Sequence, residues 1–255
     1  MKRLILSLLG LSLFAALLPA QQRQYLELRT YHLKAAEDLA AIDSYMEQAL
    51  LPALKRQGVG PVGVFAKDDQ EPDRTPNVYM LIPYDSIEQF TSLQEKLDAD
   101  QTYQMAASGY FAAPRDTPRF ARIESELLHS FKVWPQVKVP AQTASGKDRL
   151  FELRKYESHT ERMGALKVEM FNSGEVPIFL DAGIQPVFMG RAMTGPNTPN
   201  LTYMTVFEDM PALETHWKAF SAHPDWKVLS GVEKYKGTVS KIHKTWLRPR
   251  PYSGL

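Results

Sequence analysis

The chain has 255 residues, in which 30 Lys and Arg stand against 29 Asp and Glu, so its formal net charge at pH 7 is +1. This balance offers no broad electrostatic surface for nucleic acid or anionic lipid, and we predict no nucleic-acid partner. The absence of Cys excludes disulfides and thiolate metal ligands.

The first 20 residues are typical of a secretory signal peptide. Lys2 and Arg3 precede an apolar run over residues 4–18, and Pro19-Ala20 follows it. The run is short for a membrane-spanning helix of about 20 residues, although a retained N-terminal anchor is the alternative. Cleavage after Ala20 would leave a formal charge of −1. We therefore expect an exported protein, periplasmic or extracellular, without membrane contact after cleavage.

Residues 24–133 predict six elements in the order β-α-β-β-α-β, which is the ferredoxin-like unit. Alternation over 24–32 indicates a strand, and apolar residues three and four apart over 35–57 indicate a helix that Pro52 should kink. Residues 61–66 and 77–84 predict two strands around a polar loop. A helix capped by Ser86 and a strand within 119–133 complete the unit.

A second unit follows a linker over residues 134–148, which is rich in Pro, Ser and Gly. Within residues 149–248, strands are predicted over 150–157, 185–191, 201–208 and 233–247, and helices over 160–182 and 210–222. The element order of the first unit is thereby repeated.

Residue identities confirm that the two units are copies. Six positions recur with a constant separation of 125 residues, which is improbable by chance. They are Glu27, Arg29, Tyr31, Pro52, Gly58 and Pro61, matched by Glu152, Arg154, Tyr156, Pro177, Gly183 and Pro186. We therefore predict an α+β fold in which two tandem ferredoxin-like units form a dimeric α/β barrel within one chain.

The repeated strands carry the candidate ligand-binding residues. Period-two alternation places the polar residues on one strand face and the leucines on the other. We expect the leucine face to pack on the helices and the polar face to be enclosed between the two sheets. A small ligand would then contact Glu27, Arg29, Tyr31, Glu152, Arg154 and Tyr156.

Arginine is the strongest candidate of this set, because its guanidinium can bind an anionic group through two parallel hydrogen bonds. The alternative is structural. Each Arg would pair with the Glu of its own strand or of the other copy, since an isolated buried charge is very costly.

Neither a metal site nor a catalytic motif is predicted. The six His residues show no i,i+4 spacing with a carboxylate, as a zinc site on a helix would need. His129 and His243 lie in the last predicted strand of each copy, where one of them could ligate haem; ordinary packing in the strand is the competing interpretation. The catalytic residues, if any exist, are unknown.

Together these motifs resemble the NIPSNAP family of the dimeric α+β barrel superfamily. The resemblance rests on Glu-Leu-Arg-x-Tyr, on the Pro and Gly near the helix ends, and on Pro224-Asp225-Trp226, and it covers about residues 24–131 and 149–248. The first copy departs from it by having Asp100 and Tyr103 instead of that triplet.

The resemblance implies the fold but supplies no catalytic residues. The superfamily also contains small monooxygenases and haem-handling proteins. We favour a non-enzymatic binder of a small ligand without a cofactor. The alternatives are a cofactor-free monooxygenase or haem-handling enzyme, and a structural or protein-interaction module. A homodimer is compatible with each of them.

Overall fold

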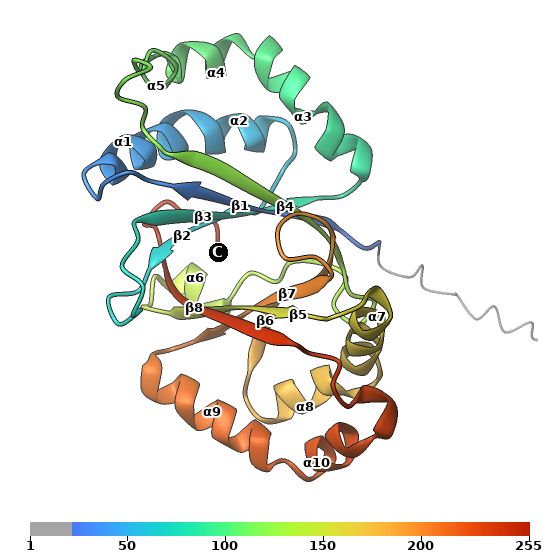
Figure 1. Cartoon of the computed structure of the whole chain (residues 1–255). Coiled ribbons are helices and arrows are strands. Elements are labelled where there is room, and N and C mark those ends of the chain that lie inside the picture. The colour runs from blue at the N-terminus through green and yellow to red at the C-terminus, as the bar shows by residue number, and fades with distance from the viewer. Residues whose placement is uncertain (1–21) are drawn as a thin grey trace, which may run out of the picture.

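The computed structural model describes residues 22–255, so the predicted signal peptide lies outside the described residues. Eight strands close into one barrel in the order β1-β3-β2-β8-β5-β7-β6-β4. Helices of the first repeat cover one side of the barrel, and helices of the second repeat cover the opposite side (Figure 1). The layers are therefore helices, sheet, sheet and helices. No helix within the described part of the chain is long and apolar enough to span a membrane.

The first repeat has the predicted β-α-β-β-α-β order, extended by two short helices. Its sheet order is β4-β1-β3-β2. The elements are β1 (Tyr25–His32), α1 (Asp38–Tyr45), η1 (Met46–Leu50), α2 (Leu51–Arg56), β2 (Gly63–Lys67), β3 (Asn77–Tyr84), α3 (Ile87–Ala99), α4 (Gln101–Ala106), α5 (Ser108–Phe111) and β4 (Arg122–Ser130).

The second repeat is built alike, with the sheet order β8-β5-β7-β6. A short helix, α6 (Ala141–Ser145), lies within the predicted linker. The other elements are β5 (Leu150–Glu157), α7 (Glu161–Met170), η2 (Phe171–Glu175), α8 (Val176–Asp181), β6 (Gln185–Thr194), β7 (Asn200–Phe207), α9 (Met210–Ala222), α10 (Pro224–Gly231), η3 (Glu233–Tyr235) and β8 (Lys241–Pro249). The final strand begins later than predicted, because residues 233–235 form a 3-10 turn.

The first helical segment of each repeat contains a π-helical turn immediately before a proline. Met46–Leu50 precedes Pro52, and Phe171–Glu175 precedes Pro177. A proline ring inside a regular α-helix clashes with the carbonyl one turn back and removes one hydrogen bond. The wider π turn accommodates the missing hydrogen bond and the bulk of the ring. The predicted irregularity of the helix at Pro52 is therefore a π turn.

Two antiparallel seams join the repeats into a single barrel. Strand β2 pairs with β8 through Phe65 and Pro249, and β4 pairs with β6 through Ser130 and Gly190. A Cβ on Gly190 would lie 2.8 Å from the Cβ of Leu128, so only glycine allows this close approach.

Aliphatic and aromatic side chains from both sheets fill the middle of the barrel. This barrel interior comprises Leu26, Leu28, Phe65, Leu81, Leu128, Phe151, Leu153, Val187, Phe188, Met204, Val206, Leu247 and Leu255. The predicted orientation of the strands was therefore wrong, because the leucine faces of β1 and β5 point into the barrel and the Glu-Arg-Tyr faces point toward the helices. A closed eight-stranded barrel has just enough room for packed side chains, and apolar ones need no hydrogen-bond partners there.

Candidate functional site

A cavity lies in the first repeat between its sheet and helices α3, α4 and α5. Its volume is about 730 Å³, within the range typical of small-molecule sites. We call it the tyrosine cavity. Its lining includes Glu27, Arg29, Tyr31, Tyr45, Leu50, Tyr84, Phe90, Leu93, Gln94, Leu97, Asp98, Tyr103, Gln104, Tyr110, Phe111 and Ile123.

A charged pair forms the polar base of this cavity. The Arg29 guanidinium donates from Nε to Glu27 Oε1 at 2.8 Å and from Nη2 to Glu27 Oε2 at 3.0 Å. Glu27 also accepts hydrogen bonds from Tyr84 at 2.8 Å and from Ser125 at 2.7 Å. The carboxylate is thus held by four donors, which places the pair rigidly on β1.

These contacts keep Glu27 ionised although it is buried. Burial acts to raise the pKa of Glu27, but Arg29 and the hydroxyls of Ser125 and Tyr84 outweigh it, so the pKa lies below its ordinary value. For Arg29, burial acts to lower the pKa and Glu27 more than offsets this, so the pKa is raised. The pair is therefore neutral as a whole at pH 7 and leaves no net charge on the cavity floor.

Tyrosines form the walls. Tyr45 and Tyr103 share a hydrogen bond of 2.8 Å between their hydroxyls, and the rings of Tyr45 and Tyr110 stack with centroids 3.7 Å apart. Burial raises the pKa of each of these three phenols, and that of Tyr31. They remain protonated at neutral pH and offer hydroxyl groups beside flat aromatic faces.

The equivalent space of the second repeat is filled. Trp217 donates from its indole nitrogen to Glu152 at 2.7 Å, and its ring lies under the Arg154 guanidinium at 3.6 Å. Phe179 and Phe220 pack edge-to-face on the same indole at 5.4 and 5.6 Å. The cation-π contact and the packed rings leave no comparable space around Arg154.

One position explains the difference between the repeats. Trp217 lies eight residues after the Asp209 N-cap of α9, and Gln94 lies eight residues after the Ser86 N-cap of α3. The two helices have the same length, so Gln94 and Trp217 are structurally equivalent. The slim, exposed glutamine leaves the cavity open where the indole closes it.

The six predicted site residues are thus separated into two groups. Glu27, Arg29 and Tyr31 come together in the tyrosine cavity, whereas the second set lies in a packed core on the far side of the barrel, where Arg154 and Glu152 form an ion pair of 2.9 Å. The structural alternative, in which each Arg pairs with the Glu of its own strand, is confirmed. Glu27 already occupies the Nε–Nη2 edge of the Arg29 guanidinium and balances its charge.

Between the sheets, where a ligand was expected, a small pocket of about 170 Å³ remains at one end of the barrel. None of the six predicted residues lines it. It contains His32 and His243, and the latter pairs with Glu157 at 2.5 Å. The interior itself is occupied by side chains, so the expectation of a ligand between the sheets was wrong for its main volume.

Haem does not fit the tyrosine cavity by its donor set. No imidazole, thiolate or thioether group is among its lining residues. Tyrosine can ligate haem iron as a phenolate, but burial raises the pKa of Tyr31, Tyr45 and Tyr110 and disfavours that form. His129 stacks on Tyr25 at 4.7 Å, away from the cavity, and His243 lies at the barrel end. Among the residues that the structure describes, no group of three His, Asp or Glu side chains is arranged to hold a metal ion.

Sequence reasoning missed most of the cavity wall. Tyr45, Tyr84, Tyr103 and Tyr110 come from four elements, α1, β3, α4 and α5. The one signal was the departure of the first copy from the second, with Tyr103 at the place of Trp226. Trp226 packs on Phe220 at 4.5 Å, while the buried Tyr103 lines the tyrosine cavity.

The NIPSNAP family model matches residues 26–129 and 151–254, which together span both repeats. The chain belongs to the NIPSNAP family. This NIPSNAP protein contains the family domain twice, and its two copies close the barrel. Among curated proteins, none matches the sequence significantly.

Solved structures with a similar fold have little sequence in common with this NIPSNAP protein. A candidate monooxygenase from Fusobacterium nucleatum subsp. nucleatum is 9% identical in sequence, with a TM-score of 0.59. The match covers 90% of this chain and 93% of the monooxygenase chain. A candidate monooxygenase from Lactobacillus acidophilus is 11% identical, with a TM-score of 0.59. That match covers 89% of this chain and 94% of the Lactobacillus chain.

Chlorite dismutase from Candidatus Nitrospira defluvii is 10% identical, with a TM-score of 0.51. The match covers 91% of this chain and 93% of the dismutase chain. At these identities the likeness establishes the dimeric α+β barrel fold alone.

Proposed function

We propose that this NIPSNAP protein binds a planar aromatic molecule in the tyrosine cavity of its first repeat. The observation that carries the proposal is the contrast between the repeats. The same Glu-Arg-Tyr framework is sealed by Trp217 in one copy and opens onto about 730 Å³ in the other. A cavity with flat aromatic walls stacks well on a flat ring.

The charge distribution favours an uncharged ligand that carries a hydroxyl or carbonyl group. Arg29 is already neutralised by Glu27, and Asp98 adds an acidic group to the lining. A carboxylate would therefore lose its hydration without meeting an unpaired cation. A phenol or ketone oxygen can instead accept from a tyrosine hydroxyl or share the amide of Gln94.

Replacing Gln94 by Trp should close the cavity as Trp217 closes its counterpart. We expect Gln94→Trp to fold normally, because the residue is exposed on α3, and to weaken binding of 1-naphthol roughly tenfold or more through lost contact area. Isothermal titration calorimetry measures the change. Glu95→Trp, which adds the same ring at the next, exposed position outside the lining, is the matched control.

Two results would contradict the proposal. One is equal binding of 1-naphthol by the Gln94→Trp and Glu95→Trp variants. The other is tighter binding of 1-naphthoate than of 1-naphthol to the unmodified cavity, since the neutral Arg29–Glu27 pair should disfavour the carboxylate.

A second candidate function is cofactor-free oxygenation of such an aromatic molecule. It is supported by the names of the structural neighbours, two candidate monooxygenases and an anthrone oxidase-like protein with a TM-score of 0.54. An anthrone can supply all the electrons, because one oxygen atom of O₂ enters the ring as a carbonyl and the other leaves as water. The reaction needs a base, and Glu27 is a weak one because its pKa is lowered.

Oxygen uptake decides between binding and oxygenation. An oxygen electrode with anthrone as the probe should show protein-dependent uptake that Gln94→Trp removes if the protein is an oxygenase. Binding of anthrone without added oxygen uptake would leave the binder as the function.

We also propose that the protein is exported, on the basis of the basic and apolar residues at its N-terminus. Fractionation of its own host, with mass spectrometry of the N-terminal peptide, tests this proposal. A cytoplasmic protein that retains Met1 would contradict it.

A further inference from the structure

A second pocket lies directly beyond the Tyr45–Tyr110 stack, outside the tyrosine cavity. It has a volume of about 200 Å³, and we call it the outer pocket. Helix α1, the π turn η1 and helices α4 and α5 surround it, together with the segment leading into β4. Its lining comprises Ala41, Ser44, Tyr45, Gln48, Ala106, Gly109, Tyr110 and Arg119.

Arg119 is the one charged residue in this lining. Its half-buried side chain has no ion pair or hydrogen bond with any residue in the described part of the chain. Arg29, on the cavity side of the same tyrosines, donates two hydrogen bonds to Glu27. The two arginines therefore differ in what they can offer a ligand: Arg119 keeps its whole guanidinium fork free.

The outer pocket contains two further hydrogen-bonding side chains besides Arg119, those of Ser44 and Gln48. Ser44 and Gln48 are four residues apart on the same helical segment, so both project to one side. Their side chains make no hydrogen bond within the described residues. No Asp or Glu lines the pocket. A planar arginine fork, a hydroxyl and an amide around a small concave surface match the acceptor oxygens of a carboxylate.

We infer that the outer pocket is a binding site for a small carboxylate attached to a flat or apolar group. The carboxylate lies against Arg119, Ser44 and Gln48, and the remainder of the ligand lies against Tyr45 and Tyr110. This site is separate from the tyrosine cavity, which takes uncharged molecules. The Tyr45–Tyr110 stack forms the wall between the two.

Benzoate and its neutral isostere benzamide test the inference by titration calorimetry at physiological salt. We expect saturable binding of benzoate, weaker binding of benzamide, and a roughly tenfold or greater loss of benzoate affinity in Arg119→Gln, the loss typical for a hydrogen-bonded charge partner. Arg115→Gln removes the same charge from an exposed position of the same segment and should leave benzoate affinity unchanged.

The closing variant Gln94→Trp distinguishes the two sites, because it should weaken 1-naphthol binding roughly tenfold or more and leave benzoate binding intact. The inference is overturned if benzoate does not saturate, if Arg115→Gln and Arg119→Gln weaken it equally, or if Gln94→Trp removes it. Because Arg119 pairs with no residue in the described part of the chain, an unchanged melting temperature of Arg119→Gln confirms that the fold is intact.

Discussion

The Arg29–Glu27 pair couples the floor of the tyrosine cavity to the stability of the fold. Because the pKa of Glu27 is lowered in the native state, its ionised form contributes stability above the unfolded-state pKa. That contribution is lost as the pH falls through the native pKa. The charged pair should therefore make this chain acid-sensitive while leaving it unaffected between neutral pH and mildly basic conditions.

Glu27→Gln should lower the free energy of unfolding at pH 7 by about 2–3 kcal/mol, because the half-buried Arg29 is left without its counter-charge. The difference should shrink as the pH is lowered from 4.5 toward 3, because the contribution is lost only as the pH falls through the lowered native pKa of Glu27. Urea unfolding at pH 7 and at pH 3 measures it, with the exposed Glu95→Gln as the control. A deficit that is the same at the two pH values would show that Glu27 acts through shape rather than charge.

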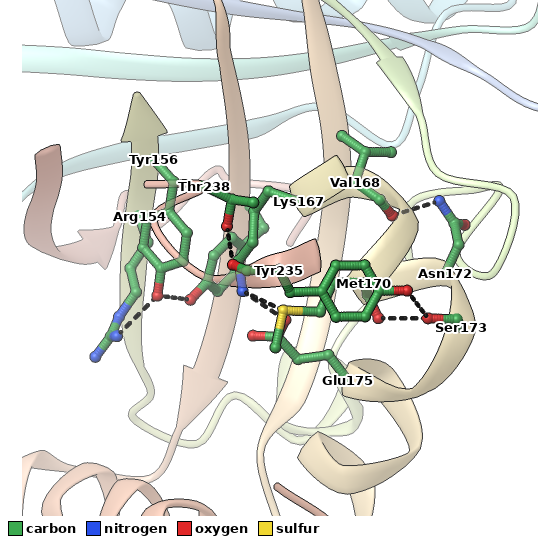
Figure 2. A network of polar contacts seen from close by, with 11 residues as sticks. Arg154, Tyr156, Lys167, Val168, Met170, Asn172, Ser173, Glu175, Tyr235 and Thr238 are labelled. Carbon is green, nitrogen blue, oxygen red and sulfur yellow. Dashed lines mark hydrogen bonds and ion pairs between the residues drawn. The ribbon is translucent and has the colours of Figure 1, made fainter. Parts of the chain in front are cut away.

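A second buried pair distinguishes the repeats. Lys167 donates to Glu175 at 2.7 Å and contacts the Met170 sulfur at 3.4 Å (Figure 2). The centroid of the Phe171 ring lies 4.8 Å from Lys167 Nζ. Burial raises the pKa of Glu175, against the influence of Lys167. At the duplication offset of 125 residues, the first repeat has Ile42 and Leu50, both buried.

The first repeat thus supplies a natural apolar replacement for this pair. Lys167→Ile alone should destabilise the protein by about 3–5 kcal/mol, since Glu175 would remain charged and buried. The double variant Lys167→Ile/Glu175→Leu should recover most of that loss or exceed the parent stability. Equal losses in the single and double variants, measured by urea unfolding, would mean that packing rather than charge decides this site.

At the scale of elements, helices α3 and α9 each begin with an N-cap residue whose side chain accepts a backbone hydrogen bond. Ser86 accepts from Gln89 N at 3.2 Å, and Asp209 accepts from Ala212 N at 2.8 Å. Each side chain satisfies one of the backbone donors that the first helical turn leaves unpaired. These caps fix where each helix starts, and hence where Gln94 and Trp217 project.

Ser86→Ala should cost about 1 kcal/mol of stability and should loosen the start of α3 over the tyrosine cavity. Hydrogen exchange of the α3 amides, measured together with urea unfolding, reports both effects. Ser92→Ala, within the same helix, should have little effect. A result in which the two variants behave alike would remove the capping role.

The strand pattern of the chain predicted elements better than it predicted their orientation. Alternation in β1 and β5 sorted the residues correctly into two faces. It did not say which face lies inside, because each face is buried: Leu26 against the other sheet and Tyr31 against helices. The prediction placed the Glu-Arg-Tyr face between the two sheets, whereas the narrow barrel interior accepts apolar side chains.

At the scale of the whole molecule, the two repeats share one core. The barrel interior draws side chains from both sheets, and the β2–β8 and β4–β6 seams bond their edges. An isolated repeat would expose this apolar face and two strand edges. Duplication within one chain therefore supplies the partner that each sheet requires.

Cutting the linker should leave the barrel assembled. With a protease site inserted after Gly146, which is exposed, we expect the cleaved halves to elute together in native size-exclusion chromatography and to separate in urea. The uncleaved insertion variant is the control. Separation under native conditions would show that covalent connection, and not the shared core, holds the repeats together.

The sequence by itself determined the duplication, the order of elements and the residues of each strand face, because periodicity and repeat spacing are local properties of the chain. The tertiary structure alone decided which face lies inside, that Trp217 closes one copy while Gln94 leaves the other open, and that Arg119 has no partner among residues 22–255. Those outcomes depend on the volume left after distant helices pack on a sheet, and no local pattern records that volume.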